Sequence, residues 1–205
     1  MDGSFYLRGL FIGFSIAAVV GPIGLLCISR TLQRGFLYGL VTGLGAATAD
    51  GIYGAIAAFG LTFIATFLVR WQIEVRLIGG IFLVYLGIRA CLSRPAEQSI
   101  QPGESHLLGV YVSTLFLTLT NPLTILSFAA VFAGLGLGTA GRDNLAAGLV
   151  SIGVFSGSTA WWLLLSGGIG LLRKKMTARW LMTINRLAGI ALLVFGIIAL
   201  LSIIW

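Results

Sequence analysis

The sequence predicts an all-α polytopic membrane protein, in which six transmembrane helices form two inverted three-helix repeats with proline-broken helices 1 and 4. Three observations lead to this fold class. The 205-residue chain is 58% hydrophobic and only 9% charged, whereas soluble domains have about 25% charged residues. Its apolar residues gather in six long runs, as membrane-spanning helices require. The first and fourth runs are each broken by a proline, at Gly21-Pro22 and at Asn121-Pro122.

Charged residues and helix breakers separate the six runs along the chain. The second run is far longer than the ~20 residues that a span needs, so it must tilt, bend or break, and Gly43 to Gly51 is one place for a break. The third run is short for a span. The runs cover about 10–28, 36–69, 77–92, 107–137, 145–172 and 187–205.

Matching glycines divide the chain into two copies of one unit. The spacing from Gly9 to Gly21 recurs from Gly109 to Asn121. A unit of three spans must be inverted in its second copy, and inverted repeats suit alternating access. We therefore expect one transmembrane domain over 1–205, with repeats at about 5–92 and 107–205 and a polar linker at 93–106.

Lysine and arginine placement gives the expected orientation. With six spans, loops one, three and five share a side and hold nine of the thirteen Lys and Arg residues, among them Arg30 and Arg34. The positive-inside rule places these loops in the cytoplasm and both termini on the opposite side.

The two proline breaks predict a polar cavity between the repeats. Pro22 and Pro122 cannot donate a backbone hydrogen bond to the preceding turn, and groups freed in this way cost several kcal/mol in hydrocarbon. Each half-helix that follows a break points its N–H groups and positive dipole end at the cavity, which favours a carboxylate. Gly21 leaves the backbone open there, and Asn121 offers both an amide donor and an acceptor. The alternative is a pair of kinks that only shape packing.

Asp50 is the acidic residue that lies well inside a predicted span. A carboxylate at this depth costs at least ~2.5–3.5 kcal/mol on insertion scales. Helical spacing places it in a seam of small residues between Gly43 and Gly54, so it should face another helix or the cavity. It could bind a substrate ammonium, carry a coupling proton, or do both. The alternative is a structural ion pair with Arg30 or Arg89.

The repeat places Thr159 of the fifth span opposite Asp50. Thr159 belongs to a hydroxyl cluster with Ser156 and Ser158, beside Trp161-Trp162. The predicted site therefore has one charged wall and one hydroxyl wall. Helix packing explains the small residues of this span equally well.

No catalytic residue, cofactor or metal is expected. His106 is the sole histidine, and Cys27 and Cys91 form no CxxC pair. The absence of a GxxxxGK[ST] motif excludes an ATP-driven pump within this chain. The net charge of +7 comes from bases in short loops, which does not fit nucleic-acid binding. The glycine seams could also pack two chains into a homo-oligomer.

These motifs together resemble the LysE/RhtB family of amino-acid exporters. The resemblance rests on Gly21-Pro22, the glycine-rich segment that ends at Asp50, and Asn121-Pro122 followed by Leu123. It implies efflux of amino acids or their derivatives across the bacterial inner membrane, driven by an ion gradient (proton or sodium) or the membrane potential; the positive-inside rule then makes both termini periplasmic. By this resemblance, the expected substrate-site residues are Gly21, Pro22, Asp50, Asn121 and Pro122. Family members often have a lysine where this chain has Leu123, so the substrate is left open.

Two other functions remain as alternatives to amino-acid export. Efflux of an inorganic cation would use the buried carboxylate and the freed carbonyls. The other alternative is a non-transporting membrane protein, either an assembly factor or a thiol–disulfide electron carrier, and the electron carrier would depend on Cys27 and Cys91. Neither cysteine lies beside a breaking proline, and the two do not occupy matching repeat positions.

Overall fold

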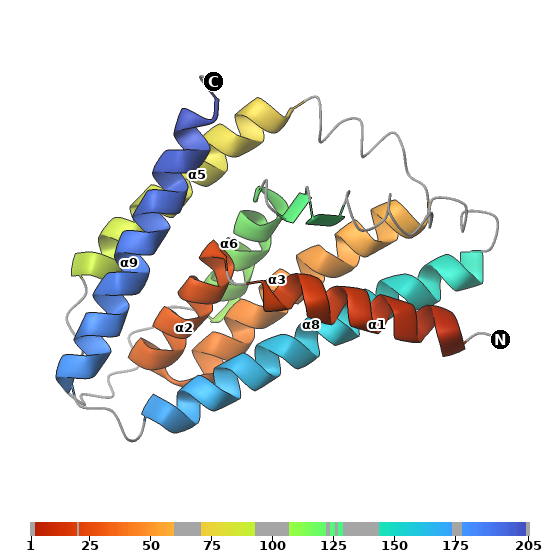
Figure 1. The fold of residues 1–205 in the computed structure, drawn as a ribbon, viewed down its shortest axis with the longest axis horizontal. Coiled ribbons are helices and arrows are strands. Elements are labelled where there is room, and N and C mark those ends of the chain that lie inside the picture. Colours follow the sequence, from red (N-terminus) through yellow and green to blue (C-terminus); the bar gives the residue numbers. More distant parts are fainter. Residues whose placement is uncertain are drawn as a thin grey trace.

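The computed structural model describes residues 3–19, 21–59, 71–92, 107–121, 124, 125, 127, 128, 144–173 and 178–203. The predicted linker, Pro122 and Leu123 lie outside these residues. The described part of the chain is built from helices, and no strand occurs in it. The helices are α1 (Gly3–Ala18), α2 (Pro22–Arg34), α3 (Phe36–Ala58), α5 (Gln72–Leu92), α6 (Leu107–Leu119), α8 (Asn144–Arg173) and α9 (Ala178–Leu201) (Figure 1).

The helix lengths confirm a multi-pass membrane architecture in its coarse form. Within the described residues, α3, α8 and α9 are long and apolar enough to cross a bilayer, and α1 with α2 adds a fourth span if the bent pair is one unit. The axes of α1 and α2 meet at 75°, so the first run is indeed broken. Shorter apolar helices lie at 77–89 and 107–119. The second run contains no break between Gly43 and Gly51, because α3 is continuous there.

Helix α3 lies at the centre of the fold and packs against α8 and α6 (Figure 1). Its glycines allow close approach: a Cβ on Gly43 would meet Trp162 of α8, and a Cβ on Gly54 would meet Val154. Higher α3 numbers thus meet lower α8 numbers, and the two helices are antiparallel. Helix α6 runs parallel to α3, because Gly45 approaches Tyr111 and Tyr53 reaches the end of α6.

Glycines also join α1 to α8 and α5 to α9. Gly9 and Gly13 of α1 face the backbone of Val150 and Val154, so α1 and α8 run parallel. In the other pair, Gly80 and Gly87 of α5 approach α9 in antiparallel order. A Cβ on Gly80 would meet the carbonyl of Gly196, and a Cβ on Gly87 would meet that of Gly189.

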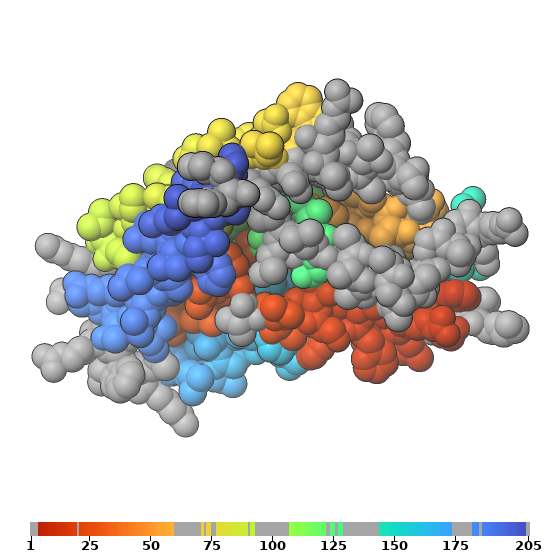
Figure 2. Space-filling view, turned by 45° about the horizontal axis from the view of Figure 1, so that its top comes forward, coloured from red at the N-terminus to blue at the C-terminus, as the bar shows by residue number. Residues whose placement is uncertain are grey.

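The outer faces of these helices expose large apolar side chains. Phe11 of α1 is 66% exposed and Leu164 of α8 is 63% exposed, and α5 and α9 carry similar residues along their lengths. Figure 2 shows α1 and α9 at the surface of the molecule. Surfaces of this extent are unusual on soluble monomers and fit contact with lipid.

Substituting Gly153 with alanine is expected to lower the free energy of unfolding by about 1–3 kcal/mol, the usual cost of overpacking. The added Cβ would meet backbone atoms of Tyr6 and Leu10 in α1, which cannot rotate away. Gly148 of the same helix is the matched control, since its Cβ would meet no atom within 4 Å. Gly148→Ala should leave stability equal or raise it by up to about 1 kcal/mol. Thermal unfolding in detergent measures both, and equal midpoints would contradict the described α1–α8 packing.

Candidate functional site: a cavity between two helix breaks

The two breaks share parts of one backbone hydrogen-bond pattern. Near each break a backbone N–H bonds three residues back, from Val19 to Ile16 O (3.3 Å) and from Asn121 to Thr118 O (3.2 Å). The residue before each breaking proline then accepts a helical hydrogen bond at its carbonyl, which joins Leu25 N to Gly21 O (3.1 Å) and Ile125 N to Asn121 O (3.2 Å).

Pro22 is the first residue of α2, a position that suits proline because a first-turn N–H has no helical partner. Gly21 precedes it in an extended conformation and contributes no capping side chain. The N–H groups of the first turn of α2 therefore lie directly after the break. The corresponding proline of the second repeat, Pro122, lies outside the described residues.

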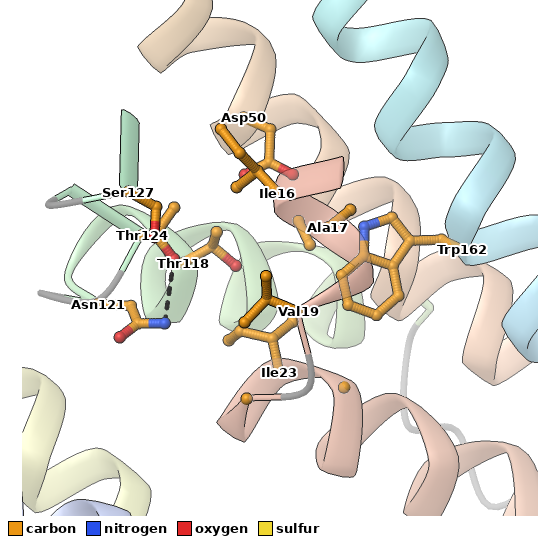
Figure 3. Close-up of a pocket in the computed structure, with 13 residues that line it drawn as sticks. Ile16, Ala17, Val19, Ile23, Asp50, Thr118, Asn121, Thr124, Ser127 and Trp162 are labelled. Carbon is orange, nitrogen blue, oxygen red and sulfur yellow. Dashed lines mark hydrogen bonds between the residues drawn. The ribbon is translucent and has the colours of Figure 1, made fainter. Parts of the chain in front are cut away.

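A cavity of about 50 Å³ lies between the two breaks and is shown in Figure 3. Four elements supply its walls: the α1–α2 break, α3, the end of α6 with the residues that follow it, and α8. Its lining residues are Ile16, Ala17, Val19, Gly21, Ile23, Gly24, Ala46, Asp50, Thr118, Asn121, Thr124, Ser127 and Trp162. The structure thus brings Gly21, Asp50 and Asn121 together around one space, although they lie in three different helical segments.

Asp50 is the acidic group of this cavity and is only 3% exposed. The Ser158 hydroxyl of α8 donates a hydrogen bond to its Oδ2 at 2.6 Å. The indole N–H of Trp162 in turn donates to Ser158 Oγ at 3.0 Å. Because a carboxylate can only accept, Ser158 supplies the proton of the first bond while its oxygen accepts the indole N–H in the second. The chain Trp162–Ser158–Asp50 therefore fixes the carboxylate at the cavity wall.

Ser158, not Thr159, is the hydroxyl of α8 that meets Asp50. Thr159 does not line the cavity, and its buried Oγ1 has no hydrogen-bond partner among the described residues. The sequence analysis placed Thr159 opposite Asp50, whereas in the structure the neighbouring hydroxyl of Ser158 meets the carboxylate and Trp162 is the residue of α8 that lines the cavity. Trp162 also belongs to the wall, a role that the sequence analysis did not assign.

Asn121 forms the opposite side of the cavity and is 8% exposed. Its side-chain nitrogen donates to Thr124 Oγ1 at 3.0 Å (Figure 3). The nearby α6 terminus is tied to α3, because Tyr53 donates its phenolic proton to Leu119 O at 2.6 Å. The Tyr53 bond therefore holds the second break against α3, the helix that carries Asp50.

Arg30 lies inside a helix, which corrects its expected position in the first loop. It belongs to α2, which continues to Arg34. Its guanidinium donates to the hydroxyls of Thr42, Ser113 and Thr114 and to the Val110 carbonyl. The alternative of an ion pair between Arg30 and Asp50 is not what the structure contains. Within the described residues, Arg30 bonds only to neutral oxygens.

The two cysteines have unrelated surroundings. Cys27 is fully buried and contacts Gly39 O and Ser166 Oγ, whereas the Sγ of Cys91 lies 3.8 Å from Arg186 O. Both are free thiols. In the part of the chain that the structure describes, no group of three or more His, Cys, Asp or Glu side chains could hold a metal ion.

Comparison with known proteins yields a family and several relatives. The model of the LysE type translocator family matches residues 14–202. A Bacillus subtilis protein named "Putative amino acid efflux protein YcgF" is 30% identical over 200 residues, which cover 93% of this chain and 92% of that protein. The "Uncharacterized membrane protein slr1627" of Synechocystis is 26% identical, with 96% of both chains covered. The Escherichia coli "Uncharacterized membrane protein YahN" is 28% identical over 52% of this chain and 49% of its own. No solved structure matches this chain significantly.

Proposed function

Because the chain belongs to the LysE type translocator family, we propose that it exports amino acids or close derivatives of amino acids from the bacterial cytoplasm. One observation carries this proposal: the Asp50 carboxylate lines the same cavity as both helix breaks. Discontinuous helices at the interface of two repeats are where secondary transporters bind their substrates. The name of the Bacillus subtilis relative points to the same class of substrate.

The cavity offers complementary groups for both ends of an amino acid. The ammonium would bind Asp50, which Ser158 holds in place. The carboxylate would bind the start of α2 after Gly21 and the amide of Asn121, because helix N-termini attract anions. The indole of Trp162 lies beside these groups and would cover the substrate from α8.

The cavity volume supports a transport cycle with moving walls. About 50 Å³ accommodates only a few water molecules. An amino acid would therefore bind only when the surrounding helices have moved apart, as they do in alternating access. A proton or a sodium ion would couple this movement to an ion gradient, and Asp50 is the group we assign to the coupling ion when no substrate is bound.

We extend the proposal to six spans in two inverted repeats. The helix contacts are matched as a two-fold relation requires: α1 with α8 corresponds to α6 with α3, and α5 pairs with α9. The observed directions, parallel in the first two pairs and antiparallel in the third, fit alternating spans. We place the protein in the inner membrane, with the α2–α3 turn cytoplasmic and both termini periplasmic.

Export from whole cells tests the proposed function. Bacterial cells that express the wild-type chain, and cells with empty vector, are loaded with mixed amino acids through dipeptides. We expect one or a few amino acids to accumulate several-fold faster in the medium of the expressing cells. If none does so despite membrane-inserted protein, amino-acid export is wrong and inorganic cations become the next substrates to screen.

A further inference from the structure

We propose that Arg30 is a latch that closes one end of the cavity, and that the carboxylate of the exported molecule opens it by binding the guanidinium. This inference rests on the proposed function and deepens it, because it makes a carboxylate a requirement for export. Arg30 is a cation on α2, and its hydrogen bonds reach from the first half of the chain to the second.

The bonds of Arg30 connect three helices. Nη1 donates to Thr42 Oγ1 of α3 at 3.2 Å and to Thr114 Oγ1 of α6 at 2.7 Å. It also lies 3.4 Å from Val110 O, and Nη2 donates to Ser113 Oγ at 3.1 Å. Three of these four bonds reach α6, the first helix of the second repeat. Separating α2 from α6 therefore requires that the guanidinium leave this cluster.

The latch lies beyond the cavity, on the side of the α2–α3 turn. Thr42 and Thr114 each precede a cavity-lining residue, Ala46 and Thr118, by one helical turn. Eight residues along α3 separate Thr42 from Asp50, which corresponds to ~12 Å. An α-amino acid carries its ammonium and carboxylate on one carbon atom, so it cannot reach Arg30 and Asp50 together. Arg30 therefore binds the substrate outside the cavity, and it is not part of the site that contains Asp50.

The acceptors of Arg30 are suited to releasing it. Thr42 donates its own proton to Tyr38 O at 2.7 Å, and both Ser113 and Thr114 donate theirs to Val110 O at 2.9 Å. These hydroxyls keep their helix-internal bonds when the guanidinium leaves, so no donor is orphaned on their side. Opening therefore leaves only the guanidinium without hydrogen-bond partners, so the guanidinium needs another acceptor.

A carboxylate is the acceptor that best replaces these oxygens. Arginine binds carboxylates bidentately, with bonds about twice as strong as those to neutral groups. In the described residues Arg30 has only neutral acceptors, so an incoming carboxylate outcompetes each of them. A substrate without this group, such as an amine or an amide, would leave the latch closed. Once Arg30 has left its cluster, the substrate would move along α2 to the first turn of this helix at the cavity.

The test compares each amino acid with its primary amide. Purified protein in liposomes is loaded with labelled alanine, leucine and lysine, and in parallel with alaninamide, leucinamide and lysinamide. Efflux from protein-free liposomes is subtracted. For wild type we expect the acid to leave at least about tenfold faster than its amide, as the loss of one charge-assisted bond predicts. Arg30→Gln should lower this ratio several-fold, to the preference for a carboxylate that the cavity itself provides, and Arg30→Lys should restore part of the difference.

A purely structural arginine would give a different result. Arg30→Gln would then slow acid and amide by the same factor and leave their ratio unchanged, which overturns the latch. If none of the amino acids that whole cells export leaves the wild-type liposomes, the proposed function itself has failed.

A second variant keeps the inference testable if Arg30→Gln does not fold. Thr114→Asp places a tethered carboxylate at the shortest Arg30 contact. It should abolish efflux of all three acids in a protein that elutes as wild type in size-exclusion chromatography, whereas wild-type efflux would contradict the latch.

Discussion

Asp50→Asn is expected to reduce export to the level of empty-vector cells. The substitution keeps the shape of the side chain but removes the negative charge that would bind the substrate ammonium or the coupling ion. A hydrogen bond to a charged group contributes about 1.5–3 kcal/mol, so the loss of substrate binding alone predicts a decrease of at least about tenfold. Loss of the coupling role would add to it. The rate of appearance of the exported amino acid in the medium, at matched expression, measures the effect.

The asparagine variant should still fold. Its amide oxygen can accept the Ser158 hydroxyl proton in the observed direction, so the serine keeps both of its hydrogen bonds. Glu74→Gln is the matched control, because it makes the same chemical change at an exposed position of α5. We expect this control to export at the wild-type rate. Wild-type export by Asp50→Asn would refute the assignment of Asp50 and leave the family membership intact.

Gly24→Leu is expected to block export as completely as Asp50→Asn does, by filling the cavity. Gly24 is a buried lining residue of the cavity, and an added Cβ would meet no heavy atom within 4 Å. The leucine side chain would therefore extend into the space that we assign to the substrate. It introduces no charge and removes no hydrogen bond.

Stability separates this block from misfolding. Leucine is a better helix former than glycine by up to about 1 kcal/mol, so the thermal midpoint of Gly24→Leu should equal or exceed that of wild type. Gly148→Leu is the matched control, since its Cβ also meets no atom within 4 Å but it lies outside the cavity. The control should export normally. A stable Gly24→Leu protein with wild-type export would show that the substrate takes another path.

The broken first helix and the cavity position of Asp50 could be anticipated because both follow from local physical rules. A proline removes a helical hydrogen bond wherever it stands, and a carboxylate inside a span needs a polar environment. These rules need no knowledge of the partner helices. The structure adds that the carbonyls of Gly21 and Asn121 accept helical hydrogen bonds from Leu25 and Ile125.

Ser158 shows what a repeat alignment cannot resolve. The alignment places Thr159 opposite Asp50, but each residue along a helix turns the side chain by about 100°. A shift of one residue therefore moves a different hydroxyl to the interface. Only the packing of α8 on α3 decides which hydroxyl it is, and that packing depends on glycine contacts distant in sequence, such as Gly43 with Trp162.

Arg30 shows the limit of reading spans from hydropathy. The apolar run ends before Arg30, so a charged residue there is placed in a loop. The helix nevertheless continues to Arg34, because three hydroxyls and a carbonyl from α3 and α6 accept the bonds of the guanidinium. Those acceptors come from both halves of the chain. The six-span topology, the orientation and the coupling ion stay predictions.

The central claim is that the exported molecule binds in the cavity between the two helix breaks. Equilibrium binding of the labelled amino acid to purified protein tests it most directly, with wild type, Gly24→Leu and Gly148→Leu compared in the same detergent. We predict saturable binding to wild type and to Gly148→Leu, and none to a Gly24→Leu protein whose thermal midpoint is unchanged. Binding of wild-type affinity to Gly24→Leu would contradict the claim.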